Sequence, residues 1–463
     1  MTYLTKYLTI FRLDDEYSLL VNTLTNAKDV IDRDTFSVLD RLRHDPANTF
    51  SGSDELMNQL KERGYVFDSQ EEESELLRKI HAFNTQIKTL SYMPSFIICP
   101  TMGCNLRCTY CFEPDEQHKN YQLLDEGQLN TILNKIRETC DQINSLQDEK
   151  GAIKKRYPRI TLFGGEPLLP ANASIIERVL DFAAELDLKV TIITNGTNIA
   201  CYSEVLEKNK QRVIMQITLD GDKETHDQRR IRADGSGTFD KTCEGIDKAL
   251  EIGIPILLRV NVDKDNLQSL NRLKDVFRAH GWIGSPFITP YLAPVICNEM
   301  NSSDNTLSET DMLKYVYDND LYGTDNSLFR SIGPVTASVE SFFKSKSDSD
   351  LWRVSYCGSG TGANFCFVPD GLIYPCLNCC GQKEHAIGTF HSEAIEIDRS
   401  KYDVWKNHDA FEKKKCKECK YLLLCGGSCP ASTKYDEEDC EVRLTYERVM
   451  ESYVRRNYKT FLE

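Results

Sequence analysis

Residues 95–114, SFIICPTMGCNLRCTYCFEP, decide how the rest of the chain is interpreted. The run SFIIC is typical of a buried strand. The loop that follows carries Cys104, Cys108 and Cys111 in the spacing C-x3-C-x2-C. A [4Fe–4S] cluster has four iron atoms, each usually bound by one thiolate. Three thiolates on one short loop therefore predict a cluster with one iron open to another ligand.

The composition of the chain restricts the class of protein to which it can belong. Of 463 residues, 40% are hydrophobic and 27% are charged, which is typical of a globular protein with two or three domains. The net charge of -15 argues against nucleic acid as a partner. The sequence has no apolar run of about 18 residues that would predict a membrane span. Acidic residues near the N-terminus argue against a signal peptide, so we expect a cytoplasmic protein.

The chain contains 18 cysteines, and most of them are clustered. The groups span residues 104–111, 357–380 and 416–440. In a cytoplasmic chain thiols stay reduced, so clustered cysteines indicate metal ligation and not disulfides. The remaining cysteines are scattered and are interpreted as small buried hydrophobic residues: Cys99, Cys140, Cys201, Cys243 and Cys297.

Strand-like and helix-like segments alternate along the middle of the chain. The runs SFIIC, RITLF, KVTIIT, VIMQITL, IPILLRVNV and FITPYL are separated by amphipathic segments of helical length. This alternation predicts βαβ units, a parallel sheet and an α/β fold. We count about six units, too few for a closed eight-unit barrel but enough for a partial one. In such folds the chemistry lies at the carboxyl ends of the strands, where the motifs of this chain fall.

The flanking segments predict further parts. Residues 1–90 suggest a hairpin followed by helices, a small α+β, winged-helix-like domain that either caps the next domain or docks a partner peptide. We expect five parts: this domain at 1–90, the barrel at 91–300, a linker with one helix at 301–356, a cysteine-rich domain at 357–440 and a C-terminal helix at 441–463.

Several motifs at the predicted strand ends resemble those of the radical S-adenosylmethionine (radical SAM) superfamily. They are the C-x3-C-x2-C loop with Tyr110 before its third cysteine, the GGEP sequence at 164–167, and the later TNG, LDG and RVN sequences. The resemblance implies a partial (β/α)6, TIM-like barrel. It also implies that the open iron binds S-adenosylmethionine and that one electron splits it to give a 5′-deoxyadenosyl radical.

The same resemblance implies which residues surround the cofactors. A guanidinium, from either Arg230 or Arg259, would pair with the methionine carboxylate. The cofactor-binding residues implied are Tyr110, Phe112, Gly164, Gly165, Glu166, Pro167, Asn195, Thr218, Asp220, Arg230 and Arg259.

The C-terminal cysteines resemble a SPASM domain, which carries two auxiliary [4Fe–4S] clusters in radical enzymes that modify peptides. The resemblance implies one cluster on Cys416, Cys419, Cys425 and Cys440, and another on Cys357, Cys376 and Cys429. The fourth ligand of the latter stays open: Cys366, which we include among the metal ligands, Cys379, Cys380 or none.

Three functions are compatible with these motifs. The first is maturation of a ribosomally made precursor peptide, recognised through its leader, by an intramolecular thioether or carbon–carbon cross-link, with a reductant such as flavodoxin or ferredoxin. The second is anaerobic sulfatase maturation; that family has an acid after the Gly-x4-Cys cysteine, where this chain has Leu377. The third is a non-catalytic zinc or electron-transfer protein. No residue is identified as the catalytic base.

Overall fold

The computed structural model describes residues 3–44, 53–91, 93–113, 115–150, 157–295, 305–322, 327–345, 352–353, 355–427, 429–430 and 440–462. The chain forms two compact units. The first unit comprises residues 1–91, 334–360 and 408–463, and the second comprises 92–333 and 361–407. This division differs from the five consecutive parts suggested by the sequence, because the cysteine-rich segment contributes to both units.

Parallel strands form the centre of the second unit. Their order in the sheet follows their order in the chain, and each pairs in parallel with the next. The strands are β6 (Ser95–Ile98), β8 (Arg159–Leu162), β9 (Val190–Thr194), β10 (Val213–Thr218), β12 (Ile256–Val262) and β13 (Ile288–Pro294). The predicted α/β class and the six predicted strands are therefore confirmed. The sheet is open, as expected for a partial barrel.

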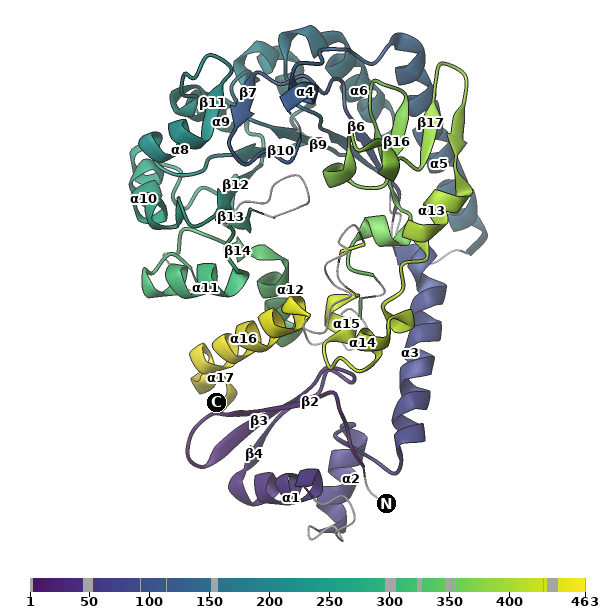
Figure 1. Cartoon of the computed structure of the whole chain (residues 1–463), viewed down its shortest axis with the longest axis vertical. Coiled ribbons are helices and arrows are strands. Elements are labelled where there is room, and N and C mark those ends of the chain that lie inside the picture. Colours follow the sequence, from purple (N-terminus) through teal and green to yellow (C-terminus); the bar gives the residue numbers. More distant parts are fainter. Residues whose placement is uncertain are drawn as a thin grey trace. The chain divides into compact units, whose positions relative to one another are not determined.

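Helices between the strands bury one apolar face against this sheet. In α6, for example, Ile176, Val179, Leu180 and Ala183 recur at helical spacing and are buried. Figure 1 shows α8, α9 and α10 along the outer side of β10, β12 and β13. The helices are α4 (Asp115–His118), α5 (Glu126–Lys150), α6 (Ala173–Glu185), α7 (Ser203–Asn209), α8 (Lys223–Arg229), α9 (Phe239–Ile252) and α10 (Leu270–Ala279).

The sheet extends beyond the predicted barrel on both sides. At one edge β14 (Ser331–Ile332) pairs in parallel with β13. At the other, β15 (Asn364–Phe367) pairs in parallel with β6 and leads into antiparallel strands. These are β16 (Leu372–Tyr374), β17 (Gly388–Phe390) and β18 (Ile395–Ile397), followed by α13 (Arg399–Lys406). The first half of the cysteine-rich segment is therefore built onto the barrel sheet.

The expectation of a linker with one helix at 301–356 was wrong. The described residues of this segment form β14 and two helices, α11 (Glu309–Asp318) and α12 (Gly333–Lys344). Met312, Leu313 and Val316 of α11 are buried. The polar composition of the segment hid these short apolar faces.

The first unit contains the predicted N-terminal hairpin. Strands β2 (Leu8–Arg12) and β3 (Tyr17–Asn22) pair antiparallel, and β4 (Lys28–Asp32), which the sequence analysis missed, completes a sheet of order β2-β3-β4. A second small sheet joins β1 (Tyr3–Leu4) to β5 (Val66–Phe67). The helices are α1 (Arg33–His44), α2 (Asp54–Glu62), α3 (Gln70–Ser91), α14 (Lys414–Lys417), α15 (Leu422–Cys425), α16 (Glu441–Arg456) and α17 (Tyr458–Leu462). The C-terminal segment is thus two helices, not one.

Residues 1–91 share a hydrophobic core with the C-terminal part of the chain. Tyr7, Leu24 and Ile80 pack in one buried cluster with Phe411 and Leu422. At its edge the His81 ring stacks on Phe411, with ring centroids 4.2 Å apart, and its Nε2 lies 2.7 Å from Asp409 Oδ2. The N-terminal segment also has a buried cluster of its own, which includes Leu20, Leu39 and Tyr65, so it combines a core of its own with one that it shares. Among the described helices, none is long and apolar enough to cross a bilayer.

The shared core predicts the effect of a truncated side chain. Leu24→Ala should lower the free energy of unfolding by about 2–5 kcal/mol, because a fully buried leucine leaves a cavity. Val404→Ala is the control, since its side chain is 73% exposed and its loss should change little. Urea-induced unfolding measures both variants. A urea midpoint of Leu24→Ala equal to that of the wild type would contradict the existence of this core.

Candidate functional site

The three cysteines of the C-x3-C-x2-C loop lie together in the second unit. The loop follows β6 and includes β7 (Leu106–Cys108), which pairs with β11 (Arg230–Arg232) so that Cys108 lies opposite Arg230. Burial raises the pKa of the Cys111 thiol, and the negative charges of Glu113, Cys108 and Cys104 raise it further. Thiolates this close repel one another unless a cation binds them, so the group fits a shared iron–sulfur cluster.

Two glycines hold the GGEP sequence against the cysteine loop. A Cβ on Gly164 would lie 2.2 Å from the Thr101 carbonyl oxygen, and one on Gly165 would lie 2.3 Å from that of Met102. Gly164 also has a φ of 115°, which side chains other than glycine rarely allow. The strand end after β8 and the cysteine loop therefore pack backbone to backbone.

Glu166 links two neighbouring strand ends, those of β8 and β9. Its Oε1 accepts hydrogen bonds from Thr194 Oγ1 at 2.6 Å and from the Leu168 amide at 2.8 Å. Its Oε2 accepts from the Asn195 amide at 2.7 Å. Burial raises the pKa of Glu166, while these donors oppose the shift. Three protein donors thus hold the carboxylate and fix the strand ends, and the role of Glu166 in binding the cofactor stays a prediction. Pro167 lies beside it, where its carbonyl accepts from Asn172 Nδ2 at 2.9 Å.

Tyr110 joins several of the predicted cofactor-binding residues in one network. Its hydroxyl donates to Asp220 Oδ2, accepts from Arg230 Nη1 at 2.6 Å and accepts from Asn261 Nδ2 at 3.1 Å. Asn261 in turn accepts from Arg259 Nε at 2.7 Å. Strand pairing places Thr218 opposite Arg259, and the Phe112 ring stacks at 6.4 Å on that of Phe163. The structure therefore brings together residues predicted from four separate motifs.

The network favours one arginine as the carboxylate partner. Among the described residues, Arg230 is buried and its Nε has no hydrogen-bond acceptor. A buried guanidinium donor without an acceptor is costly unless a ligand supplies one, so Arg230 fits the carboxylate of S-adenosylmethionine. Arg229, which the sequence analysis did not single out, is paired through Nη1, while its buried Nε and Nη2 have no hydrogen-bond acceptor among the described residues. Its Nη1 lies 2.8 Å from both Asp263 oxygens, and its guanidinium lies over the Tyr110 ring.

The C-terminal cysteines fall into separate groups. Burial raises the pKa of Cys419 to about 11, and the charges of Cys425, Cys416 and Cys440 add to the shift. Four thiols that act on one another in this way fit one cluster. Of the other predicted ligands, Cys357 and Cys429 belong to the first unit and Cys376 to the second, so their shared cluster stays a prediction.

A thiol group that the sequence did not reveal lies in the second unit. Cys380 forms side-chain hydrogen bonds with Cys366 and Cys99, and these donors lower its pKa to about 6. Cys99, interpreted from the sequence as a small hydrophobic residue, therefore belongs to a thiol group. Cys366 and Cys380, two candidates for the open ligand position, lie together. Cys297 lies outside the described residues.

The cysteine loop gives a direct test. Cys108→Ala should abolish cleavage of S-adenosylmethionine and reduce iron content by the equivalent of one cluster, because two thiolates cannot hold the cubane in place of three. Cys201→Ala is the matched control, since Cys201 is an exposed cysteine of the same unit. Iron and sulfide analysis and 5′-deoxyadenosine assays measure both variants. Wild-type cleavage by Cys108→Ala would refute the assignment.

Comparison with known proteins agrees with this geometry. The radical SAM superfamily model matches residues 98–276. The cysteine-type anaerobic sulfatase-maturating enzyme of Clostridium perfringens (strain 13) is 25% identical over 390 residues, covering 80% of this chain and 95% of the relative. GTP 3′,8-cyclase of Rhizobium leguminosarum is 36% identical over 169 residues, covering 36% of this chain and 42% of the relative.

Solved structures share the fold. Native anSMEcpe with bound AdoMet and a peptide has a TM-score of 0.56 at 19% identity, covering 80% of this chain and 99% of that chain. SuiB of Streptococcus suis bound to S-adenosylmethionine has a TM-score of 0.50 at 18% identity, covering 92% of this chain and 95% of that chain. The matched family region contains the cysteine loop, the GGEP sequence and the Tyr110 network. Residues 98–276 are therefore a radical SAM domain, and this domain makes the protein an enzyme that uses a [4Fe–4S] cluster and S-adenosylmethionine.

Proposed function

We propose that this enzyme is a maturase that modifies a ribosomally made precursor peptide by forming an intramolecular thioether or carbon–carbon cross-link. The observation that carries the proposal is the second thiol group on Cys416, Cys419, Cys425 and Cys440, separate from the radical SAM loop. Such a group fits an auxiliary cluster as the SPASM resemblance implies. The chain also resembles in fold SuiB and a peptide-bound anSMEcpe.

The electron balance explains why a second cluster is needed. S-adenosylmethionine and one electron give methionine and a radical that removes one hydrogen atom from a peptide C–H bond. Closing a C–S bond then releases the thiol proton and one electron. A cluster on the C-terminal cysteines would accept that electron, and a reductant of the flavodoxin or ferredoxin class would supply the first one.

Sulfatase maturation is the second candidate, favoured by the sequence match to the Clostridium perfringens enzyme. It predicts a carboxylate after Cys376, yet Leu377 occupies that position and starts a short 3-10 helix, Leu377–Cys379. An aliphatic side chain cannot remove a proton from a substrate serine or cysteine.

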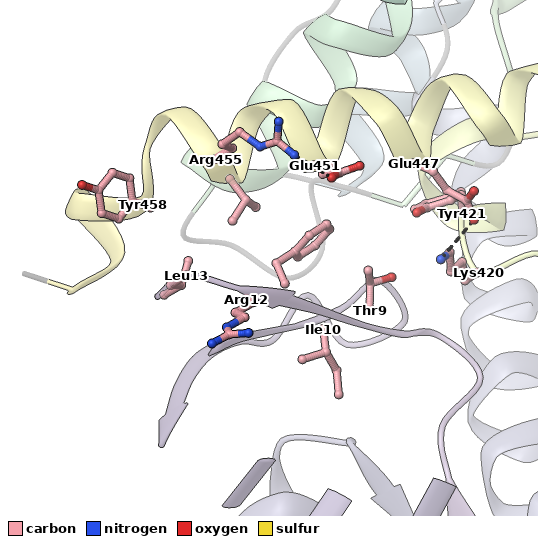
Figure 2. Close-up of a pocket in the computed structure, with 12 residues that line it drawn as sticks. Thr9, Ile10, Arg12, Leu13, Lys420, Tyr421, Glu447, Glu451, Arg455 and Tyr458 are labelled. Carbon is pink, nitrogen blue, oxygen red and sulfur yellow. Dashed lines mark hydrogen bonds and ion pairs between the residues drawn. The ribbon is translucent and has the colours of Figure 1, made fainter. Parts of the chain in front are cut away.

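A groove in the first unit supports peptide docking. One wall is β2, an edge strand in the sheet order β2-β3-β4, and the other is formed by α16, α17 and residues 420–421. Its volume is about 760 Å³. Figure 2 shows α16 running alongside β2, with Thr9 on the helix side of the strand and Ile10 on the opposite side. The facing wall combines charged side chains, among them Glu447, Glu451 and Arg455, with Val454 and Tyr458. An edge strand beside such a wall suits an extended polar peptide, because backbone hydrogen bonds are available at the strand edge.

The groove wall offers a test of leader docking. Removing residues 1–90 would destroy the core shared with Phe411, so a point variant is preferable. Phe11→Glu should weaken binding of a fluorescent precursor peptide at least tenfold, because a charge replaces an aromatic groove residue, and should leave S-adenosylmethionine cleavage intact. Val30→Glu, at the partly exposed opposite edge strand β4, is the matched control. Weaker binding only in Val30→Glu would place docking on the other edge.

The product distinguishes the two candidate functions. A thioether or carbon–carbon link removes two hydrogens from the peptide and creates no aldehyde, whereas sulfatase maturation creates one. We expect a mass loss of two hydrogens in a co-expressed Cys-containing precursor and no reaction with a hydrazide probe. A hydrazide-reactive product from a sulfatase peptide would instead support sulfatase maturation.

A further inference from the structure

A buried histidine–carboxylate pair contacts the radical SAM cysteine loop. His118 Nε2 lies 3.4 Å from Cys111 Sγ and 3.3 Å from Glu113 Oε2. The side chains of His118 and Glu113 are only 2% and 3% exposed. These atoms of Cys111, Glu113 and His118 all lie within 4.8 Å of one another. The pair thus lies directly beside one ligand of the cluster.

The local fold fixes this pair in place. His118 is the last residue of α4, a single turn, and its carbonyl accepts from the Cys104 amide at 3.1 Å. The imidazole therefore belongs to a segment tied to the first cysteine of the loop while it contacts the third. Glu113 precedes this turn, and among the described residues its Oε1 is buried without a hydrogen-bond donor. Burying a carboxylate with one unsatisfied oxygen costs free energy, so a contribution to stability does not explain why a glutamate occupies position 113.

The charge of Glu113 acts on thiols beyond Cys111. It raises the pKa of Cys104, and it also acts on Cys99 and Cys380, which form a thiol group with Cys366 in the same unit. A single carboxylate therefore contributes negative potential throughout the cysteine-lined part of the second unit. Reducing an iron–sulfur cluster adds one negative charge, so a fixed carboxylate nearby disfavours reduction, whereas an N–H donor to a ligand sulfur favours it.

We propose that Glu113 and His118 tune the reduction potential of the radical SAM cluster through Cys111, with opposite effects. His118 donates Nε2–H to the ligand sulfur and raises the potential. Glu113 lowers the potential by its charge and orients the imidazole, because its Oε2 shares the single Nε2–H with the ligand sulfur. Both are positioning residues, because they act on the cluster through a ligand and contact no reacting atom.

The proposal predicts shifts of opposite sign. Glu113→Gln keeps the size of the side chain and removes its charge, so the midpoint potential should rise. His118→Phe removes the donor, so the potential should fall. His118→Gln, whose amide nitrogen can occupy the place of Nε2, should restore a potential closer to that of the wild type. We expect at least a tenfold change in the ratio of oxidised to reduced cluster at fixed potential, equivalent to 59 mV for one electron.

Potentiometric titration of the anaerobically reconstituted full chain, followed by electron paramagnetic resonance, measures this potential. Titrations with and without S-adenosylmethionine distinguish the radical SAM cluster, because its open iron binds the cofactor. His280→Gln is the matched control, since His280 pairs with Asp247 at 2.9 Å on the exposed side of the same unit. Its potential should equal that of the wild type.

Shifts of the same sign in Glu113→Gln and His118→Phe, or none in either, would overturn the proposal. Iron content and thermal denaturation show whether each variant is folded and loaded. If His118→Phe does not retain its cluster, the potentials of Glu113→Gln and His118→Gln test the proposal instead. A midpoint potential of Glu113→Gln that is not higher than that of the wild type then refutes the proposal.

Discussion

The site depends on the contact between the backbone of Gly164 and Gly165 and the carbonyl groups of Thr101 and Met102. This contact joins the loop after β8 to the loop after β6, and no side chain fits between them. Because neighbouring parallel strands end at the same edge, the cysteines and the GGEP sequence would lie near each other in any such sheet. The glycines convert that proximity into direct packing. The cysteine loop therefore continues directly from β6 of the sheet and packs against the backbone of Gly164 and Gly165.

The remaining strand ends are joined to this point by buried polar side chains. Glu166 ties the loop after β8 to that after β9. Asp220 accepts from the Asn261 amide at 2.8 Å and from Tyr110, so it ties β10 and β12 to the cysteine loop. A buried polar network of this kind is stable only when its members satisfy one another. Among the described residues, Arg230 Nε and the Nε and Nη2 atoms of Arg229 are exceptions, and a bound carboxylate would satisfy such donors.

Local patterns allowed the prediction of the barrel strands and the cluster loop, because each strand is a β-rich run and most of these runs carry a motif at their carboxyl end. Pairings between distant segments left no such signal. Strand β15 pairs with β6 although more than 260 residues separate them, and the trio of Cys99, Cys366 and Cys380 depends on that pairing. Glu113 and His118 were missed for another reason: a glutamate and a histidine beside a cysteine motif are unremarkable until the turn of α4 brings them together. Strand β4 was missed because KDVID is mostly charged.

The first unit connects the groove to the auxiliary cysteines through one short loop. Lys420 and Tyr421 line the groove, yet they lie between Cys419 and Cys425 in the chain. The Tyr421 amide donates to Cys419 Sγ at 3.4 Å, and Thr23 Oγ1 donates to the Lys420 carbonyl. Cys416 itself packs against the hydrophobic core that Tyr7 and Ile80 share with Phe411. Since cores are close-packed, a displacement of this loop would move both the groove wall and the thiolates. The N-terminal segment and residues 408–425 therefore pack as one body, although the whole barrel lies between them in sequence.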